Sequence, residues 1–291
     1  MRPAKASIVL TAHQEGRNVR STIEAIAVST DVDYEIILVD DDSSDGSCDF
    51  ALACDDRRIR LIREGRHGVA GARSLGAAHA TGEVLVFLDA HTAPRAGWLE
   101  VLVREIGCDG NRVLAPAVAD ARDPAAYGCG AKLVDRDLRY RWLLPANQEP
   151  YEIPIAPGGA LVIARALYED VGGFDRMRTY GVEDVEFSLR CWSYGIPCVG
   201  VPAAVVEHVF RSETPYPVDK ADYVHNVLRC ATVHFNEARL GRIVEHAATH
   251  PRFAPAAARL LASDVFTKRE QVRSRRINDD EWFFRRFPTG V

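Results

Sequence analysis

Gly82-Glu-Val-Leu-Val-Phe-Leu-Asp-Ala-His-Thr-Ala-Pro94 is the stretch of this sequence that decides the fold. Its five apolar residues, Val84 to Leu88, are too few for an ordinary helix and suit a strand that is buried on both faces. Pro94 is expected to end any hydrogen-bonding ladder after the strand, because proline has no backbone N–H. The stretch therefore predicts a central strand of a parallel sheet.

Two side chains able to bind a metal ion, Asp89 and His91, follow this strand. Residues two apart in extended backbone point to the same side. In open α/β sheets, ligands bind beyond the carboxyl ends of the strands. The pair therefore indicates a ligand or metal site, although an Asp that caps a turn beside an exposed His is an equally ordinary interpretation.

The composition is that of an ordinary soluble globular protein, with 291 residues, 47% hydrophobic and 26% charged residues and a net charge of -5. The acidic balance argues against nucleic-acid binding. No apolar run approaches the roughly 20 residues that span a bilayer, and no signal peptide is expected before the first strand. The seven cysteines are scattered without a Cys-x-x-Cys pair, which favours reduced cysteines and a cytoplasmic location.

Short apolar runs alternate with helical patterns along the first half of the chain. Helices are expected from Val19 to Val28 and from Gly71 to Ala80. Buried strands are expected at Ser7–Thr11, Glu35–Val39, Ile59–Ile62 and Val84–Leu88. This order predicts an α/β fold with a parallel sheet.

Two polar loops of this half suit a nucleotide. Four aspartates fall within Asp40–Asp45, directly after a strand, where their mutual repulsion is relieved if a base or ribose donates hydrogen bonds; a solvated turn is the alternative. The glycine-rich loop Gly65–Gly71 opens a helix and is flanked by Arg66 and Arg73, which suits a pyrophosphate. It matches neither Gly-x-Gly-x-x-Gly nor a P-loop, so a dinucleotide-dependent oxidoreductase is disfavoured.

The second half adds a third candidate metal ligand. Ile155–Ile163 is expected to be a strand entered through a glycine pair, where a ligand can approach closely. Ala203–Phe210 is expected to be another strand, with His208 near its end. One carboxylate and two imidazoles from Asp89, His91 and His208 would leave positions open for diphosphate oxygens on a divalent ion.

Taken together, these segments resemble a GT-A fold glycosyltransferase of the large inverting family. Their likeness is greatest to the polypeptide N-acetylgalactosaminyltransferases, through Thr11-Ala-His13, Ala80-Thr-Gly-Glu-Val-Leu-Val-Phe-Leu-Asp-Ala-His91 and Glu207-His-Val-Phe-Arg-Ser-Glu-Thr-Pro-Tyr216. The resemblance implies an α/β GT-A domain over residues 1–218, a mostly parallel sheet flanked by helices. Residues 1–92 would be its nucleotide-binding half and residues 93–218 its acceptor half. A helical C-terminal extension over residues 219–291 would pack on this domain or serve as a dimerisation arm.

The resemblance also implies contacts with a UDP-sugar donor. Thr11 and His13 would contact the uridine, and Asp41 the uracil or ribose. Arg66 and Arg73 would serve the diphosphate. The implied acceptor is a hydroxyl or similar nucleophile on a peptide, a glycan or a small molecule.

The remaining implied roles concern the metal and the sugar. Asp89, His91 and His208 would hold Mn²⁺, or Mg²⁺, against the diphosphate, and Gly159 would line the sugar pocket. The segment from Arg211 to Tyr216 would close over the donor, with both of these residues facing it. The donor sugar could be an N-acetylhexosamine.

Two departures from the family pattern bear on mechanism. From the length of the sequence we expect neither the lectin domain nor the membrane anchor that is usual in the animal enzymes. Those retaining enzymes carry Gly-Gly-Glu-Asn where this chain has Gly181-Val-Glu-Asp184. We therefore expect an inverting transfer with Asp184 as general base and Glu183 binding sugar hydroxyls. A retaining transferase and a non-catalytic nucleotide-sugar or glycan-binding protein are the alternatives.

Overall fold

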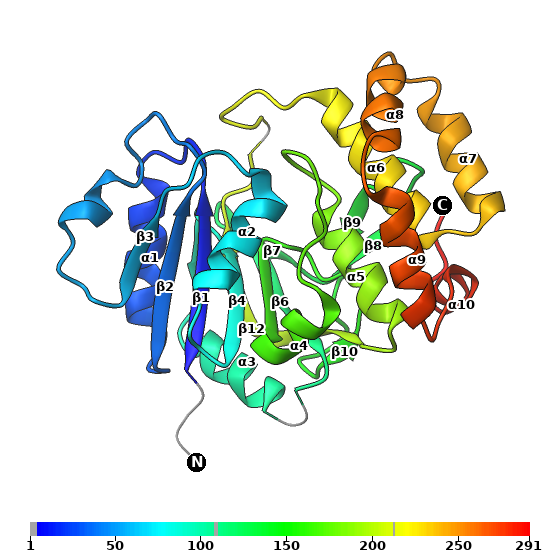
Figure 1. The fold of residues 1–291 in the computed structure, drawn as a ribbon. Helices are drawn as coiled ribbons and strands as arrows, with labels where there is room; N and C mark the ends of the chain where they lie inside the picture. Colours follow the sequence, from blue (N-terminus) through cyan, green and yellow to red (C-terminus); the bar gives the residue numbers. More distant parts are fainter. Residues whose placement is uncertain (1–4, 108–109, 212) are drawn as a thin grey trace.

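A mixed β-sheet runs through the centre of the computed structural model, which describes residues 5–107, 110–211 and 213–291 (Figure 1). Within these residues the sheet has ten strands, with the order β10-β12-β6-β11-β4-β1-β2-β3; β5 pairs with β12 and β7 with β6. A separate hairpin joins β8 (Ala131–Leu133) to β9 (Tyr140–Trp142). The strands of the main sheet are β1 (Ala6–Ala12), β2 (Tyr34–Asp40), β3 (Ile59–Ile62), β4 (Val84–Asp89), β5 (Thr92–Pro94), β6 (Val113–Asp120), β7 (Asp123–Cys129), β10 (Tyr151–Glu152), β11 (Ala160–Ala164) and β12 (Cys198–His208).

Helices cover both faces of the sheet, and a short 3₁₀ helix, Asp49–Ala53, precedes β3. The α-helices are α1 (Asn18–Ser29), α2 (Gly68–His79), α3 (Trp98–Ile106), α4 (Arg165–Val171), α5 (Glu183–Ser193), α6 (Lys220–His234), α7 (Glu237–Ala247), α8 (Phe253–Leu261), α9 (Val265–Arg275) and α10 (Asp280–Arg286). Alternate residues of β1 enter opposite core layers: Ile8 and Leu10 pack with α1 and α3, and Val9 packs with α2 and α5. The α/β fold is therefore confirmed.

The nucleotide-side half matches its predicted elements closely. β1 pairs with β2 and β4, and β2 pairs with β3, all in parallel. The second predicted helix begins at Gly68 rather than at residue 71. Helix α2 lies close to the sheet because Gly76 has no side chain: a Cβ there would lie 2.3 Å from a methyl group of Val9.

The second half departs from the predictions at two strands. β11 lies antiparallel between β4 and β6, and it begins only at Ala160, because Pro157 and the glycine pair occupy the start of the expected segment. The strand β5 was not predicted, but it ends at Pro94, where the proline was expected to end the ladder. Pro94 is the last residue of β5 and is register partner of Val206 in antiparallel β12. A proline is tolerated at the end of so short a strand, where its missing N–H breaks no continuous ladder.

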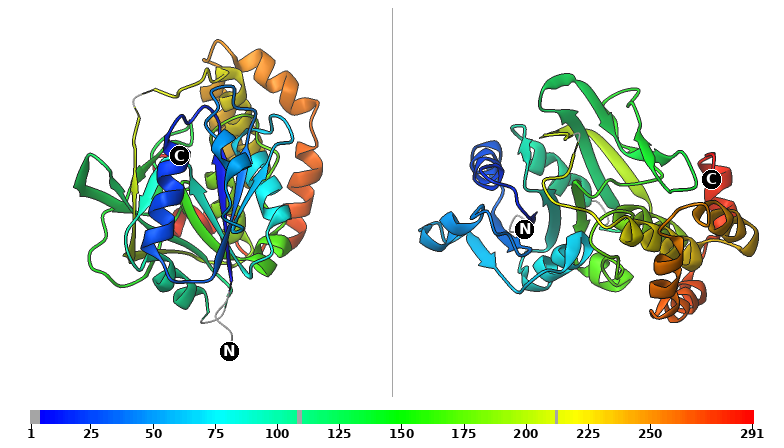
Figure 2. Two further views of the ribbon diagram at one scale, coloured as in Figure 1. Left: turned by 90° about the vertical axis from the view of Figure 1, so that its left-hand side faces the viewer. Right: turned by 90° about the horizontal axis from the view of Figure 1, so that it is seen from above.

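The tail is helical, as the sequence predicted, and α6 to α10 gather at the end of the molecule opposite β3 (Figures 1 and 2). One side of α6 enters the core beside the sheet through Val227 and Ala231, and its other side packs on α8 and α9 through Leu228. The division at residue 218 stays a prediction, since the apolar core is continuous across it. No helix in the described part of the chain is long and apolar enough to cross a membrane.

The cysteines in the described ranges are all free thiols, and most are buried. Cys108 lies outside those ranges, as does Ser212 in the predicted closing segment. The cysteines in the described ranges therefore agree with the expectation that most cysteines of this chain are packing residues.

Candidate active site

A cavity of about 410 Å³ lies at the carboxyl ends of β1, β2 and β4. A second hollow of about 380 Å³ adjoins it and shares several lining residues. The first cavity is lined by predicted site residues from distant parts of the chain: Thr11, His13, Asp41, Arg66, Arg73, Asp89, His91, Gly159, Glu183, Asp184 and Tyr216. The second is lined by the other two, His208 and Arg211. The fold thus brings all thirteen predicted residues together.

Three potential metal ligands meet where the two hollows adjoin. One ligand atom from each of Asp89, His91 and His208 lies within 4.8 Å of the others. His208 Nε2 lies 3.4 Å from Asp89 Oδ2, and the two imidazole rings are 4.6 Å apart. The topology explains their meeting, because the pairing of β5 with β12 sets His208 opposite Thr92, the residue after His91.

Gly159 allows β11 to pass directly behind this cluster. Its carbonyl accepts a hydrogen bond from the N–H of Asp89. A Cβ at this position would lie 2.9 Å from Asp89 Oδ2. Glycine is therefore needed here for close approach, as the glycine pair in the sequence indicated.

The charges around the cluster favour a cation. Burial alone would raise the pKa of the Asp89 carboxyl, but the hydrogen bond with His208 and the charge of Arg73 hold it well below its usual range. Burial lowers the pKa of His91, but the carboxylates of Glu15 and Asp89 outweigh it and raise that pKa above its ordinary value. The Nδ1 atom of His208 is buried without a hydrogen-bond partner in the described residues, and its Nε2 atom is the one that faces Asp89.

Glu15 is a site residue that sequence analysis missed. Its buried carboxylate lies 3.2 Å from His91 Nδ1 and accepts hydrogen bonds from both terminal nitrogens of Arg211. The only signal in the sequence was its place in the loop after the first strand. Glu15 therefore links a potential metal ligand to the segment expected to close over the donor.

The described part of that closing segment touches the loop after β1. The rings of His13 and Tyr216 are 4.7 Å apart in an edge-on arrangement. The guanidinium of exposed Arg66 lies 6.0 Å from the centre of the Tyr216 ring. Residues 213–219, which lead into α6, lie above the strand ends (Figure 1). Tyr216 therefore lies where a nucleotide between these groups would meet it.

The acidic run after β2 has partners within the protein. Asp41 accepts hydrogen bonds from the N–H groups of His67 at 2.5 Å and Gly68 at 3.0 Å, at the start of α2. Asp40 pairs with Arg63 at 2.8 Å. These contacts relieve the repulsion from which a nucleotide contact was inferred, so the contact of Asp41 with a base or ribose stays a prediction.

Arg73 lies beneath the cavity rather than in its mouth. It is 3% exposed and donates to Asp89 at 3.1 Å and to Glu183 at 2.9 Å. A Cβ on Gly158 would lie 2.5 Å from its Nη1 atom. In this structure Arg73 joins a metal-site carboxylate to the first turn of α5, and its role toward a diphosphate stays a prediction.

The two acidic residues that begin α5 have different surroundings. Burial and the charge of Asp184 raise the pKa of Glu183 to about 6, although Arg73 opposes them. The Oε2 atom of Glu183 is buried and accepts no hydrogen bond from the described residues. Asp184 Oδ2 accepts from the N–H of Gly158 at 3.0 Å and from the Tyr140 hydroxyl at 3.2 Å. Glu183 is thus the carboxylate with the free oxygen.

Aromatic side chains complete the cavity, and sequence reasoning missed them. They are Tyr140 on β9, Tyr180 before α5 and Tyr223 on α6. Burial and the charge of Asp184 keep the pKa of Tyr140 well above its ordinary value, so its hydroxyl stays a donor. No local pattern marks these tyrosines, because each reaches the cavity only through the tertiary fold.

Comparison with known proteins places this arrangement in a family. Residues 7–172 match the model of glycosyl transferase family 2, which is more than half of the chain. The chain belongs to glycosyl transferase family 2. The match covers β1 to α4 and so includes Asp89 and His91 of the metal cluster.

The family 2 chain is similar to named relatives over most of its length. Polypeptide N-acetylgalactosaminyltransferase 3 of Mus musculus is 31% identical over 259 residues, which is 79% of this chain and 41% of the relative. Polypeptide N-acetylgalactosaminyltransferase 16 of Homo sapiens is 31% identical over 253 residues, 79% of this chain and 45% of the relative. The chain therefore spans less than half the length of these relatives.

Solved structures confirm the GT-A fold. GalNAc-T7 with UDP, GalNAc and Mn²⁺ superimposes with a TM-score of 0.80 at 22% identity, over 98% of this chain and 57% of the other. The mannosyltransferase PcManGT from Pyrobaculum calidifontis, in complex with GDP-Man and Mn²⁺, gives a TM-score of 0.58 at 18% identity, over 94% of this chain and 86% of the other. This member of glycosyl transferase family 2 therefore has a GT-A fold, and it resembles the catalytic domains of polypeptide N-acetylgalactosaminyltransferases.

Proposed function

We propose that this glycosyltransferase moves a sugar from a UDP-sugar to an acceptor hydroxyl with the aid of Mn²⁺. The observation that carries the proposal is the cluster of Asp89, His91 and His208 beside a cavity at the carboxyl ends of the strands. Ligands of open α/β sheets bind at this edge. The structures of GalNAc-T7 with UDP, GalNAc and Mn²⁺ and of PcManGT with GDP-Man and Mn²⁺ support the same assignment.

The donor set fits a borderline divalent ion such as Mn²⁺. One carboxylate and two imidazoles are ligands that such ions accept, and His208 has a buried ring nitrogen without a protein partner. When bound, the ion would neutralise charge that develops on the departing UDP. Glu15 would fix the ring of His91 from behind, as the outer partners of metal ligands do.

The protein's own groups would hold the donor around that site. Arg211 and Arg66 stand at the rim of the two hollows, where guanidinium groups can bind diphosphate oxygens. Buried Glu183 offers an unpaired oxygen to a sugar hydroxyl. Since the relatives are named N-acetylgalactosaminyltransferases, we propose a UDP-N-acetylhexosamine as donor and a peptide hydroxyl as the first acceptor class to test.

We further propose that transfer retains the anomeric configuration, in place of the inversion that the sequence led us to expect. A general base needs a free oxygen within reach of the acceptor proton. Asp184 instead directs its Oδ2 atom at the N–H of Gly158 and the hydroxyl of Tyr140. These bonds suit a residue that holds the backbone before β11 in place.

Proton NMR of the fresh product tests the stereochemistry. An α-linked product from an α-linked donor is the expected result, and Asp184→Asn should then lose less than about tenfold in rate. A β-linked product, with a loss on the order of 10²–10⁴ in Asp184→Asn, would overturn retention and make Asp184 the general base.

The rival function is a binding protein that uses the same fold without catalysis. Release of UDP from a panel of UDP-sugars, each with an acceptor mixture, separates the two. We expect release that requires Mn²⁺ and is abolished by a chelator. Tight UDP binding without release from any donor would refute the transferase and favour the binding protein.

A further inference from the structure

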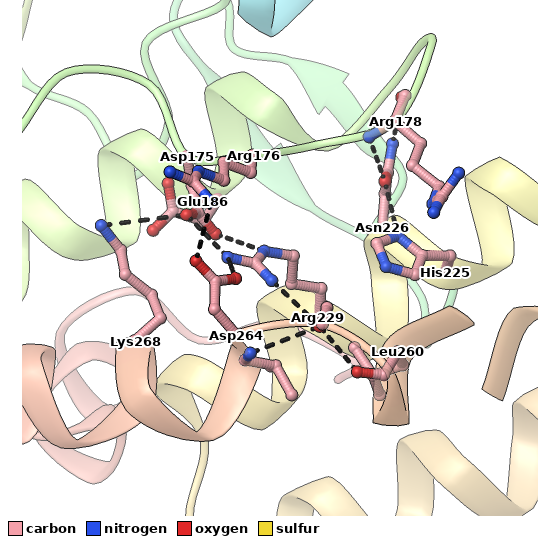
Figure 3. Close-up of polar contacts among 12 residues, drawn as sticks. Asp175, Arg176, Arg178, Glu186, His225, Asn226, Arg229, Leu260, Asp264 and Lys268 are labelled. Carbon is pink, nitrogen blue, oxygen red and sulfur yellow. Dashed lines mark hydrogen bonds and ion pairs between the residues drawn. The ribbon is translucent and has the colours of Figure 1, made fainter. Parts of the chain in front are cut away.

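Asn226 of α6 directs its side-chain amide at one backbone segment, residues 178–181, and Figure 3 shows its contacts with Arg178. Its only other polar contact among the described residues is with the neighbouring His225, whose Nδ1 atom lies 3.1 Å from its Oδ1 atom. The Oδ1 atom of Asn226 accepts the N–H of Arg178 at 2.8 Å. Its Nδ2 atom donates to the carbonyls of Arg178 at 2.8 Å, Gly181 at 2.9 Å and Tyr180 at 3.3 Å. Asn226 is completely buried, so these contacts are not shared with solvent.

The segment that Asn226 contacts has an unfavourable backbone conformation. Gly181 has a φ of 93° and Val182 a φ of 73°. A β-branched residue such as Val182 rarely adopts the left-handed region, and such strain persists only where the surroundings enforce it. The amide of Asn226 supplies that enforcement on the residues immediately before Val182.

The same turn is also held from the side of α2. The carbonyl of Thr179 accepts the N–H of Val69 at 2.9 Å, and its hydroxyl donates to Asp222 at 3.2 Å. A Cβ on Gly68 would lie 2.8 Å from the backbone of Thr179. The turn is therefore fixed between the first turn of α2 and the face of α6 that carries Asn226.

This turn leads directly into the acidic residues of the active site. Tyr180 lines the cavity, and Glu183 and Asp184 follow Val182 as the first residues of α5. A change of φ at Val182 would rotate both carboxylates relative to the metal cluster. Their placement is therefore coupled to a residue of α6 that touches neither the cavity nor the cluster.

A simpler role for Asn226 would be to attach α6 to the core. That attachment has other, stronger sources. Arg229 of α6 forms buried hydrogen bonds to Asp175 at 2.7 and 3.0 Å, which Figure 3 shows beside Asp264 and Lys268. Val227 and Ala231 pack in the main core. Apart from its contact with His225, the hydrogen bonds of Asn226 go to the turn.

We propose that Asn226 is a positioning residue for the transfer reaction: it holds the turn at residues 178–182 in its left-handed form so that Glu183 and Asp184 face the cavity. The inference rests on the proposed transferase function. It makes α6 of the C-terminal extension a part of the machinery that orients the active site.

Two variants and one control test this role. Asn226→Ala removes every contact with the turn. Asn226→Asp keeps the shape and an acceptor for Arg178, but it sets an oxygen against three carbonyls. Val265→Ala is the control, because Val265 is equally buried in the cluster of α6, α8 and α9 and does not contact the turn. Thermal unfolding shows which variants fold. If Asn226→Ala does not fold, the isosteric variant Asn226→Asp provides the test.

Hydrogen exchange of residues 178–184, the affinity for UDP with Mn²⁺, and kcat are measured for each protein. We expect exchange at least about tenfold faster in both Asn226 variants and unchanged in the control. UDP affinity should persist, because the metal cluster, Thr11 and His13 lie on other elements. The kcat should fall by about 10²-fold, as small displacements of reacting groups do.

Three results would overturn the positioning role: unchanged exchange in a folded Asn226 variant, loosened exchange with normal kcat, or an equal loss of kcat in Val265→Ala. A wild-type protein that transfers no sugar, while its Asn226 variants show the loosened turn, would instead overturn the proposed function. The exchange measurement distinguishes these failures because it does not depend on catalysis.

Discussion

At the residue scale, His208 tests the metal cluster most directly, because it lies 119 residues after Asp89 in the chain. Removing an outer-shell partner of a metal ligand typically costs 10–100-fold in affinity, so we expect His208→Ala to weaken Mn²⁺-dependent UDP binding by at least about 100-fold. Titration calorimetry measures this affinity. His79→Ala is the control, since His79 pairs with Glu64 away from the cavity.

The outcome for His208→Ala is interpretable only if the fold persists. Its near-ultraviolet circular dichroism should match that of the wild type, because His208 is at the very end of β12. A folded variant with undiminished Mn²⁺-dependent UDP affinity would remove His208 from the site and leave Asp89 and His91 without a third protein ligand.

His91 makes metal binding depend on pH. Burial lowers its pKa, but Glu15 and Asp89 outweigh burial and raise it. Without metal, the protonated ring paired with Glu15 stabilises the fold below the unfolded pKa, and this stability is lost as pH rises through the folded pKa. A metal ion binds the neutral ring, so its affinity should fall about tenfold per pH unit below the pKa of His91.

The Mn²⁺-induced rise in melting temperature should therefore be larger at pH 8 than at pH 6. Glu15→Gln removes the charge that raises the pKa of His91, so it should shift this dependence to lower pH. An equal Mn²⁺-induced rise at both pH values in the wild type would show that no histidine proton competes with the metal.

At the element scale, the start of α2 shows how a carboxylate can be structural and still line a nucleotide cavity. Asp41 accepts hydrogen bonds from two N–H groups at the start of α2, those of His67 and Gly68, which would otherwise lack partners. In Asp41→Asn, one of them would face an amide donor, which should lower the free energy of unfolding by about 1–3 kcal/mol. Urea denaturation measures the change. Asp42→Asn is a matched control: its side chain is exposed, and Asn tolerates the φ of 67°.

UDP binding by the same pair of variants separates the two roles of Asp41. If Asp41 also contacts the nucleotide, its Asn variant should bind UDP more weakly even where it is fully folded. Unchanged unfolding in Asp41→Asn would contradict its capping role, whatever the result for UDP.

The elements that sequence could predict are those whose signals are local. Composition alone predicts the buried strands β1, β2 and β4, and it predicts α2 through its small residues. The ligand histidines were also predictable, because each lies at or just after the end of a strand. β5 was not, since its three residues form a strand only by pairing with β12, which no local pattern shows.

The same limit applies within the active site. Tyr140, Tyr180 and Glu15 are ordinary residues in their own segments and become site residues only when the hairpin, the turn before α5 and the first loop meet. Asp184 was found by its position at a helix start. Its hydrogen bonds to Gly158 and Tyr140, on which its role depends, join three separate segments.

At the scale of the whole molecule, the extension is joined to the transferase core by buried contacts of several kinds. Large apolar side chains from the extension, Val227, Phe235, Ile243 and Phe283, belong to the core cluster beside the sheet. Arg229 also neutralises buried Asp175. A dimerisation role for its outer surface stays a prediction, and light scattering tests it.

We therefore expect a chain that ends at Val218 to fail to fold. Each of the four large apolar side chains contributes about 1.5–3 kcal/mol through burial. Their sum, roughly 6–12 kcal/mol, is comparable to the entire stability of a typical domain, about 5–15 kcal/mol. Loss of Arg229 would add the cost of an unpaired carboxylate at Asp175, which is strongly destabilising when buried.

Circular dichroism and urea denaturation of the shortened chain measure this dependence. We expect no cooperative transition and no near-ultraviolet signal for the chain ending at Val218. A chain ending at Phe287 loses only the last four residues, keeps every helix of the extension and should unfold like the wild type. If residues 1–218 instead unfold cooperatively with protected amides in the central strands, they form a domain that is stable alone. The turn before α5 would then be the feature that depends on the extension, through Asn226, while the sheet would not.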